Sequence, residues 1–251
     1  MGRLTDKVAI VTGGAQGQGE AIVRAFVAEG ARVVIADVAK EPGAALADEL
    51  GDAAIFRHHD VTDEASWTTL VGETNERWGP VSVLVNNAGI LRFGQIDEMS
   101  LEEAELVWRV NQGGCFLGMK AVVPTMKEHG GGSIINASSV EGMGGMGSVS
   151  AYCGSKWAIR GMTKAVSHEL AARNIRVNSI HPGMIDTPMT QAHGGDLAME
   201  FGATKVPMRR VGKPVDVAGA YVFLASDESA YVTGAEIAVD GGVTATHAFG
   251  G

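Results

Sequence analysis

The chain has 251 residues, 20 Lys and Arg against 29 Asp and Glu, and a formal net charge of −9. Apolar residues make up 45% and charged residues 20%, which suits a globular core and excludes a disordered chain. The acidic balance argues against a nucleic-acid partner, because phosphate binding needs a surplus of Lys and Arg on one face. No run approaches the ~18 uninterrupted apolar residues of a membrane span, and no signal peptide is visible. We therefore expect a cytoplasmic protein.

Short apolar runs alternate with helical stretches along the chain. Val8–Val11 is apolar without alternation, as expected of a strand buried on both faces of a parallel sheet. The other predicted strands are Arg32–Ala36, Ala54–His58, Val81–Val85, Ser133–Ala137, Ile175–Ile180 and Glu236–Val239. The predicted helices are Glu20–Glu29, Glu41–Leu50, Glu64–Trp78, Leu101–Lys127 and Ala151–Arg173. This alternation predicts an α/β fold, a parallel sheet with helices on both faces.

The sequence also indicates how the chain is divided into domains. No Pro- or Ser-rich linker divides it, so we predict a single domain over residues 1–251. The least patterned segment is 189–206, which contains three glycines and is a candidate mobile lid over a substrate. Neither the two cysteines nor the histidines show metal-ligand spacing, since the adjacent His58 and His59 would face opposite ways at the end of a strand. We predict no metal site.

A glycine-rich loop, Thr12–Gly19, follows the first predicted strand and opens the first helix. Its glycines permit a sharp turn, and they allow backbone N–H groups to approach a pyrophosphate at the N-terminus of the helix. Asp37 ends the second strand, at about the separation expected for the residue that holds the ribose of a dinucleotide. Its carboxylate would repel the 2′-phosphate of NADP, and its neighbours Gln16 and Val38 are neutral, so NAD is favoured. A plain tight turn and a solvated acid are the alternatives.

Tyr152 and Lys156 lie one helical turn apart and so share a helix face. A neighbouring ammonium stabilises a phenolate, so we expect Lys156 to lower the pKa of Tyr152 from about 10. Such a tyrosine can exchange a proton with an alcohol. Ser138 and Ser139 follow the strand Ser133–Ala137, where α/β sheets bind ligands, so a hydroxyl there can position a substrate oxygen beside Tyr152. Taken alone, the Tyr–Lys pair could equally be a pair on a helix surface.

A serine hydrolase is the obvious rival for these serines. It requires a Gly-x-Ser-x-Gly nucleophile elbow with His and acid partners. The segment Gly147–Ala151 does not complete that pattern, and Ser138-Ser139 has no flanking glycines. The sequence therefore argues against a hydrolase.

Together, these motifs resemble the short-chain dehydrogenase/reductase family over essentially the whole chain. The resemblance rests on Thr12–Gly19, Asp60-Val61, Asn86-Asn87-Ala88-Gly89, Asn111, Ser139, Tyr152, Lys156 and Pro182-Gly183. It implies a doubly wound Rossmann-type domain with a seven-stranded parallel sheet, and usually a homotetramer. It also implies a catalytic tetrad of Asn111, Ser139, Tyr152 and Lys156. In that tetrad Asn111 would hold a water that connects Lys156 to solvent, with an amide that merely kinks its helix as the alternative.

The resemblance also implies where the cofactor binds. Asp60 would contact adenine, Asn87 would lie under the adenosine ribose, and Ile185 and Thr187 would hold the carboxamide. The candidate cofactor-binding residues are Gly13, Gln16, Gly17, Gln18, Gly19, Asp37, Val38, Asp60, Val61, Asn87, Ala88, Gly89, Tyr152, Lys156, Pro182, Gly183, Ile185 and Thr187. Gln18 departs from the family, which usually has an aliphatic residue there, and this bears on cofactor affinity rather than on the type of reaction.

Within the family the chain looks like the bacterial 3α/20β-hydroxysteroid dehydrogenases, through segments such as Ser155-Lys156-Trp157 and His181–Met184. This implies a secondary alcohol or ketone on an apolar cyclic or steroid-like substrate. Flexible methionines suit an adaptable apolar pocket, although several could simply fill the core under the lid. The candidate substrate-binding residues are Ser139, Met146, Tyr152 and Met184.

The sequence thus predicts an NAD-dependent oxidoreductase that interconverts a secondary alcohol and a ketone. Two alternatives stay open. One is a 3-oxoacyl thioester reductase, which usually prefers NADPH and a basic patch such as Arg209, Arg210 and Lys213 could form. The other is a non-catalytic NAD-binding regulatory protein, which would be expected to lose part of the tetrad. Apolar residues on the two long helices and a small apolar tail, Val243–Gly251, favour contacts between subunits and a homotetramer.

Overall fold

The computed structural model describes residues 2–245. Its seven strands form one parallel sheet in the order β3-β2-β1-β4-β5-β6-β7. The strands are β1 (Val8–Thr12), β2 (Arg32–Asp37), β3 (Ala54–His58), β4 (Val83–Asn86), β5 (Gly132–Ala137), β6 (Ile175–Pro182) and β7 (Glu236–Val239). The order reverses between β1 and β4, and open α/β sheets bind ligands at the carboxyl ends of strands at such a switch point. The predicted doubly wound Rossmann-type sheet is confirmed.

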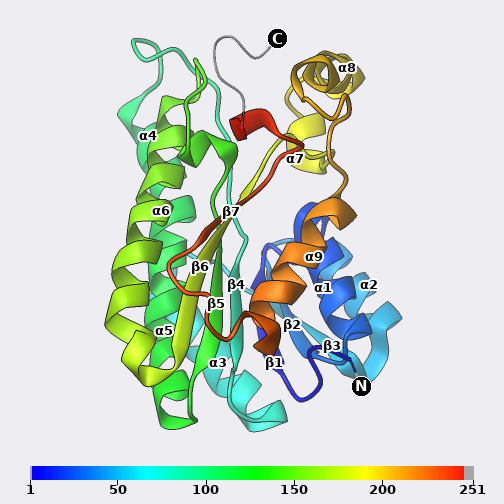
Figure 1. Cartoon of the computed structure of the whole chain (residues 1–251), viewed down its shortest axis with the longest axis vertical. Helices are drawn as coiled ribbons and strands as arrows, with labels where there is room; N and C mark the ends of the chain where they lie inside the picture. Colours follow the sequence, from blue (N-terminus) through cyan, green and yellow to red (C-terminus); the bar gives the residue numbers. More distant parts are fainter. Residues whose placement is uncertain (1, 246–251) are drawn as a thin grey trace.

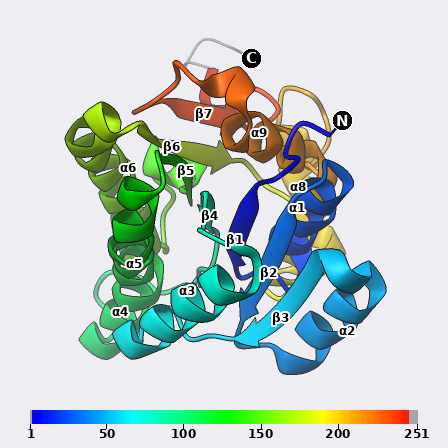
Figure 2. The ribbon, with the colours of Figure 1, turned by 90° about the horizontal axis from the view of Figure 1, so that it is seen from below.

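Helices cover both faces of the sheet (Figures 1 and 2). One face carries α1 (Gly17–Ala28), α2 (Lys40–Leu50) and α9 (Pro214–Ala225). The other carries α3 (Glu64–Trp78), α5 (Gly114–Glu128) and α6 (Ser150–Leu170). The helix α4 (Leu101–Trp108) packs on α6, and the short α7 (Pro188–Gln191) and α8 (Gly195–Lys205) lie beyond the carboxyl ends of the strands.

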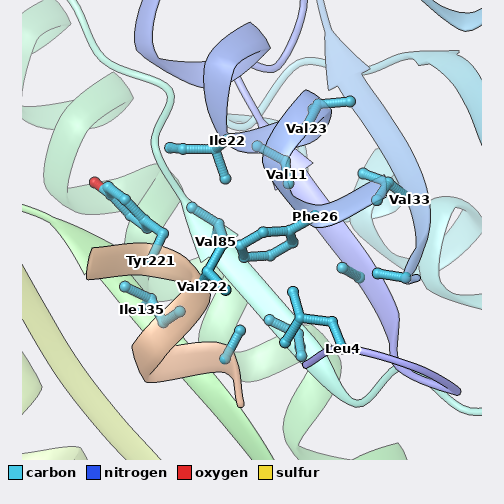
Figure 3. Packing of buried hydrophobic residues seen from close by; sticks show 14 of the residues in the cluster. Leu4, Val11, Ile22, Val23, Phe26, Val33, Val85, Ile135, Tyr221 and Val222 are labelled. Atoms are coloured by element: carbon cyan, nitrogen blue, oxygen red, sulfur yellow. The ribbon is translucent and has the colours of Figure 1, made fainter. Parts of the chain in front are cut away.

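Two hydrophobic cores hold these layers together. On one face, Phe26 of α1 and Tyr221 of α9 are fully buried in one cluster with the strand residue Val85 (Figure 3). On the other face, Trp67 of α3 and Ile134 of β5 are buried in a second cluster. Burying an apolar side chain of this size stabilises the fold by roughly 1.5–3 kcal/mol. The cores fix the strands, and thereby the loops at their carboxyl ends.

Most predicted helices and strands are present, but the structure differs from the prediction in three places. The stretch Leu101–Lys127 is helical but contains a π-helical turn at Arg109–Gly113, which separates α4 from α5. The helix α9 was not predicted, because it is apolar on nearly every side and shows no polar stripe. The least patterned segment, 189–206, is largely helical, since it contains most of α7 and all of α8.

The last described residues form a short turn. Val243–Ala245 forms a short 3₁₀ turn, and the rest of the predicted tail contact lies outside the described residues. Within residues 2–245, no helix has the length and apolar character needed to cross a lipid bilayer.

Candidate active site

A cleft of about 460 Å³ opens at the switch point of the sheet. It is lined by every predicted cofactor-binding residue except Gly183 and Ile185. Gly183 packs against Asp240, and Ile185 is buried beside Gly212. The lining also includes eight residues that were not predicted from the sequence to bind the cofactor: Ala36, His59, Ile90, Val110, Ala137, Ser138, Pro188 and Met189. One continuous cleft therefore joins the glycine-rich loop to Tyr152 and Lys156.

The glycine-rich loop adopts a conformation that its glycines make possible. Gly13 and Gly17 have φ of +61° and +59°, in the left-handed region that side chains rarely adopt. A Cβ atom on Gly19 would collide with the main-chain oxygen of Gly13. The loop leads into α1 at Gly17, so the unpaired N–H groups of the helix N-terminus lie at the cleft. This cradle fits a dinucleotide pyrophosphate.

Asn87 braces the loop across the switch point. Its Nδ2 donates to the main-chain oxygens of Thr12 and Gly13, both at 3.0 Å. The hydroxyl of Thr12 accepts hydrogen bonds from the backbone N–H groups of Asn87 and Ala88, at 3.0 and 3.1 Å. The carboxyl ends of β1 and β4 are thus tied together, and the structure gives Asn87 this bracing role beside the ribose contact predicted for it.

Asp37 ends β2 with a nearly buried carboxylate, 9% exposed. Its Oδ2 accepts from the N–H of Ala15 at 3.0 Å, and its Oδ1 accepts from that of Ala39 at 2.9 Å. A carboxylate has about four acceptor positions, so both oxygens can still accept hydrogen bonds from ribose hydroxyls. Asp37 is therefore fixed in place by two backbone donors before any ligand binds.

The far end of the cleft is lined by His59, Asp60 and Val61, which follow β3. The Asp60 carboxylate accepts from the backbone N–H and the hydroxyl of Thr62, both at 2.9 Å, and these bonds hold the pKa of Asp60 below its usual value. His59 lies edge-on to Trp67, and its burial lowers its pKa to about 4. The histidine is therefore neutral and packs as part of the wall.

Tyr152 and Lys156 lie on one face of α6 and both line the cleft. Lys156 is only 4% exposed, its Nζ donates to the main-chain oxygen of Ala137 at 2.8 Å, and burial lowers its pKa to about 8. The same Nζ lies 5.4 Å from the centroid of the Tyr152 ring. The shared helix face predicted for the pair is present. The contact with Ala137 was missed, although the position of Ala137 at the end of β5 is a usable signal.

The prediction that Lys156 lowers the pKa of Tyr152 is wrong. Burial raises the pKa of Tyr152 to about 12, a hydrogen bond with Ser139 opposes the rise, and the negative charge of Glu141 adds to it. The ammonium of Lys156 is directed at Ala137 and stands over the ring, so it does not offset the desolvation of the phenol. The phenol is protonated at neutral pH.

Asn111 lies in the π-helical turn and is 1% exposed. Its Oδ1 accepts from the N–H of Ile90 at 2.8 Å, and its Nδ2 donates to the oxygen of Ile90 and to the hydroxyl of Ser155, both at 3.0 Å. A Cβ on Gly89 would stand 3.2 Å from Asn111 Oδ1 and 3.6 Å from Lys156 Nζ. Asn111 therefore lies near Lys156 behind the cleft wall, with its amide bound by protein groups.

Ser139 also lies just outside the lining of this cleft. It caps the 3₁₀ turn Val140–Gly142, where its hydroxyl accepts from the N–H of Glu141 at 3.1 Å. Ser138 lines the cleft instead, and its hydroxyl donates to the main-chain oxygen of Lys156 at 3.0 Å. Ser138 thus ties β5 to α6, and Ser139 lies close enough to Tyr152 to lower the pKa of its phenol.

The predicted methionine contacts are not brought to the cleft. Met146 is 47% exposed in the loop before α6, and Met184 packs where a side chain on Gly202 of α8 would stand. Neither lines the cleft, whereas Met189 of α7 does. Met184 therefore fills space under α8, which is the alternative that the sequence left open.

Comparison with known families shows which family the chain belongs to. A family model described as Enoyl-(Acyl carrier protein) reductase, a model of short-chain dehydrogenases/reductases, matches residues 13–244. The chain belongs to the short-chain dehydrogenase/reductase family. A 3-alpha-(or 20-beta)-hydroxysteroid dehydrogenase of Mycobacterium tuberculosis is 50% identical over 97% of this chain and 92% of its own.

Two further relatives show the range of chemistry around this short-chain dehydrogenase/reductase. A trans-4-hydroxycyclohexanecarboxylate dehydrogenase of Sinomonas cyclohexanicum is 42% identical over 97% of this chain and 95% of its own. An NADP-dependent (R)-specific alcohol dehydrogenase of Lentilactobacillus kefiri is 44% identical over 97% of this chain and 98% of its own.

As a short-chain dehydrogenase/reductase, the protein is an oxidoreductase that acts on CH–OH groups with a nicotinamide cofactor. The glycine cradle, the open N-terminus of α1 and the anchored Asp37 are the features of the cleft that fit such a dinucleotide. Within residues 2–245, no group of three or more His, Cys, Asp or Glu side chains is arranged to hold a metal ion.

Proposed function

We propose that the protein is an NAD-dependent dehydrogenase that interconverts a secondary alcohol and a ketone on an apolar cyclic or steroid-like substrate. One observation carries the proposal: a single cleft is lined by Asp37, by the glycine-rich loop, and by Tyr152 and Lys156. The first two suit the adenosine half and the pyrophosphate of a dinucleotide, and the last two offer proton chemistry at its other end. Residues 1–251 would then form one dinucleotide-binding and catalytic domain.

The choice of NAD over NADP rests on Asp37. Its carboxylate is fixed by Ala15 and Ala39, so it cannot easily turn away from a 2′-phosphate. A phosphate placed against a fixed, nearly buried negative charge is repelled strongly. Membership of the family leaves this choice open, since the relative from Lentilactobacillus kefiri is NADP-dependent.

The proton chemistry follows from the tetrad. Ser139 and Tyr152 would hold the substrate oxygen, and Tyr152 would give its proton to the oxygen of a ketone or take one from an alcohol. The buried ammonium of Lys156, 5.4 Å from the centroid of the tyrosyl ring, would then stabilise the negative charge on Tyr152 while the proton is on the substrate. Asn111, which lies near Lys156, would hold the water through which that proton exchanges with solvent. A bound nicotinamide supplies the hydride exchange.

The proposed substrate class rests on the relatives and on the lining of the cleft. The hydroxysteroid, hydroxycyclohexanecarboxylate and cyclopentanol dehydrogenases among the relatives are named for cyclic alcohols. Ile90 and Met189 contribute apolar side chains to the lining of the cleft. The ring of Phe93, after β4, lies 5.1 Å from that of His193, between α7 and α8. This contact supports the proposal that residues 189–206 form a lid over the substrate, with Met146 and Met184 reaching it only on closure.

The alternatives have weaker support. A thioester reductase that binds an acidic carrier needs free cations, but Arg210 of the candidate basic patch is paired with Asp216 at 2.6 Å. A non-catalytic regulatory protein would not need the contacts that join Lys156 to Ala137 and Asn111 to Ser155.

The quaternary structure and location are proposals as well. The predicted homotetramer is supported by apolar side chains on the outer faces of α4, α5 and α6, where Leu101, Phe116 and Trp157 are 66%, 54% and 46% exposed. Exposed large apolar side chains on neighbouring helices are typical of subunit contacts. A cytoplasmic location remains a prediction.

A coenzyme and substrate panel tests the proposed function. The purified protein would be assayed in both directions with NAD(H) and NADP(H), using a hydroxysteroid, cyclohexanol, an acyclic secondary alcohol and the corresponding ketones, together with a 3-oxoacyl thioester. We expect turnover of the cyclic compounds with NAD(H) at least about tenfold above that with NADP(H). Turnover of the thioester alone, with NADPH, would contradict the proposal.

A further inference from the structure

The 3₁₀ turn that follows Ser139 carries a carboxylate to which the proton chemistry assigns no task. The N–H of Glu141 donates to Ser139 Oγ at 3.1 Å, so the backbone of Glu141 is fixed beside that hydroxyl. The side chain returns towards α6, where Oε2 accepts from the thiol of Cys153 at 3.5 Å. Cys153 directly follows Tyr152. The backbone of Glu141 therefore lies beside the hydroxyl of Ser139, and its carboxylate is held by the residue that follows Tyr152 on α6.

This carboxylate has few partners of its own. A carboxylate offers about four acceptor positions, and a thiol is a weak donor. In the described part of the chain, no Lys, Arg or His forms an ion pair with Glu141, which is partly exposed. Its charge also acts on the reacting group, since it raises the pKa of Tyr152. Glu141 thus carries an uncompensated negative charge, with acceptor positions to fill, on the turn that follows Ser139 and within electrostatic range of Tyr152.

We propose that Glu141 determines substrate specificity: its carboxylate accepts a hydrogen bond from a second hydroxyl or another donor group of the substrate, and it repels substrates that carry an anion near the reacting carbon. The class so selected is neutral or cationic cyclic alcohols with a second donor, such as cyclic diols. The inference rests on the proposed function, because it requires the reacting oxygen to lie at Ser139 and Tyr152.

Two physical effects would make Glu141 discriminate between substrates. A site with an acceptor held in place favours a substrate that supplies the donor, because the group is otherwise left poorly paired on closure. A carboxylate on the substrate meets a like charge in a partly desolvated site, where repulsion exceeds that in water. Each effect is expected to change kcat/KM by about 10-fold or more.

The test compares three related alcohols: cyclohexanol, trans-1,4-cyclohexanediol and trans-4-hydroxycyclohexanecarboxylate. For the wild-type protein we expect the diol to have the highest kcat/KM and the carboxylate the lowest. Glu141→Gln removes the charge and should raise kcat/KM for the carboxylate, relative to cyclohexanol, about tenfold. Glu141→Met removes the acceptor and should abolish the preference for the diol. Glu102→Gln, at an exposed site in the first turn of α4, is the matched control and should change neither ratio.

A pH profile gives a second readout that a purely structural role would not move. Within residues 2–245, the titratable groups that act on Tyr152 or lie over its ring are Lys156 and Cys153 of α6 and Glu141 of the 3₁₀ turn. Removing the charge in Glu141→Gln should move the midpoint of the rise of kcat/KM for cyclohexanol oxidation to lower pH, by about half a unit or more. In Glu102→Gln the midpoint should stay where it is in the wild type.

The outcomes separate this inference from the function on which it rests. If the wild type oxidises cyclohexanol, but Glu141→Gln and Glu141→Met keep its substrate ratios and midpoint, Glu141 has no role in specificity and the inference is overturned. If the wild type oxidises none of the three alcohols with either coenzyme while a thioester is reduced, the proposed function itself fails and the inference falls with it.

Discussion

The imidazole of His181 donates a hydrogen bond from Nδ1 to the main-chain oxygen of Ser139 at 2.9 Å. Nδ1 must be the donor because a carbonyl oxygen only accepts. His181 is fully buried near the end of β6, its pKa is lowered by that burial, and its Nε2 lies 2.9 Å from the hydroxyl of Ser179. A neutral ring that accepts from Ser179 and donates to Ser139 thus ties β6 to the turn that carries the proposed catalytic serine.

Replacing His181 should impair the alignment of Ser139 more than cofactor binding. In His181→Leu the oxygen of Ser139 loses its donor, and we expect kcat to fall about 10- to 100-fold while the dissociation constant of NADH changes less than twofold. His181→Asn keeps an N–H donor and should recover much of kcat. Steady-state kinetics and fluorescence titration with NADH measure the two quantities. A full kcat in His181→Leu would remove this role.

Changing Asp37 should weaken the preference for NAD. Asp37→Asn keeps one of the two acceptors that hold the backbone and removes the charge that opposes a 2′-phosphate, so the ratio of kcat/KM with NAD to that with NADP should fall about 100-fold. Asp48→Asn, on the exposed side of α2, is the matched control. An unchanged ratio in Asp37→Asn would show that coenzyme choice is made elsewhere.

Closing the glycine-rich loop with a side chain should weaken the binding of NADH. In Gly19→Ala the new methyl group would meet the oxygen of Gly13, so the loop must open and the affinity for NADH should fall at least about tenfold. Gly72→Ala, in α3, meets nothing within 4 Å and should raise the free energy of unfolding by about 0.5–1 kcal/mol with unchanged NADH affinity. Calorimetric titration and urea unfolding measure the two effects. Equal NADH affinity in both variants would contradict the proposed cradle.

The buried Lys156 should make stability depend on pH. Its pKa is lowered from 10.5 to about 8, so between these values the unfolded chain binds more protons than the native protein does. The free energy of unfolding therefore rises with pH through this window, and the penalty for the buried charge is fully present below pH 8. Lys156→Met lacks this dependence. From pH 7.5 to pH 10, urea unfolding should show the wild type gaining about 2 kcal/mol relative to Lys156→Met. A constant difference would mean that Lys156 titrates normally.

Local patterns predicted the parts of this site that depend on spacing along one element. Tyr152 and Lys156 share a face because they are one turn apart, and Asp37 lies at the cleft because it ends a strand next to the switch point. The raised pKa of Tyr152 could not be predicted, because it depends on burial by distant segments and on the charge of Glu141. The π-helical turn at Asn111 likewise breaks a helical period that the sequence carries without interruption.

The helices that were not predicted also lack a local pattern that could identify them. The helix α9 lies in the core, with Tyr221 and Val217 fully buried, and has no polar stripe by which periodicity could identify it. In contrast, α8 exposes Leu197 and Phe201, so its apolar residues do not mark a buried face. Its helical structure could not be read from the pattern of polar and apolar positions.

The proposed function requires that the oxygen of Tyr152 exchange the proton of the substrate alcohol beside a bound NAD. The most direct measurement is the rate of NADH formation from NAD and cyclohexanol by Tyr152→Phe, at saturating concentrations of coenzyme verified by calorimetry. We expect Tyr152→Phe to bind NADH within about twofold of the wild type and to turn over at least about 10²–10⁴-fold more slowly. A variant that binds NADH and turns over at close to the wild-type rate would contradict it.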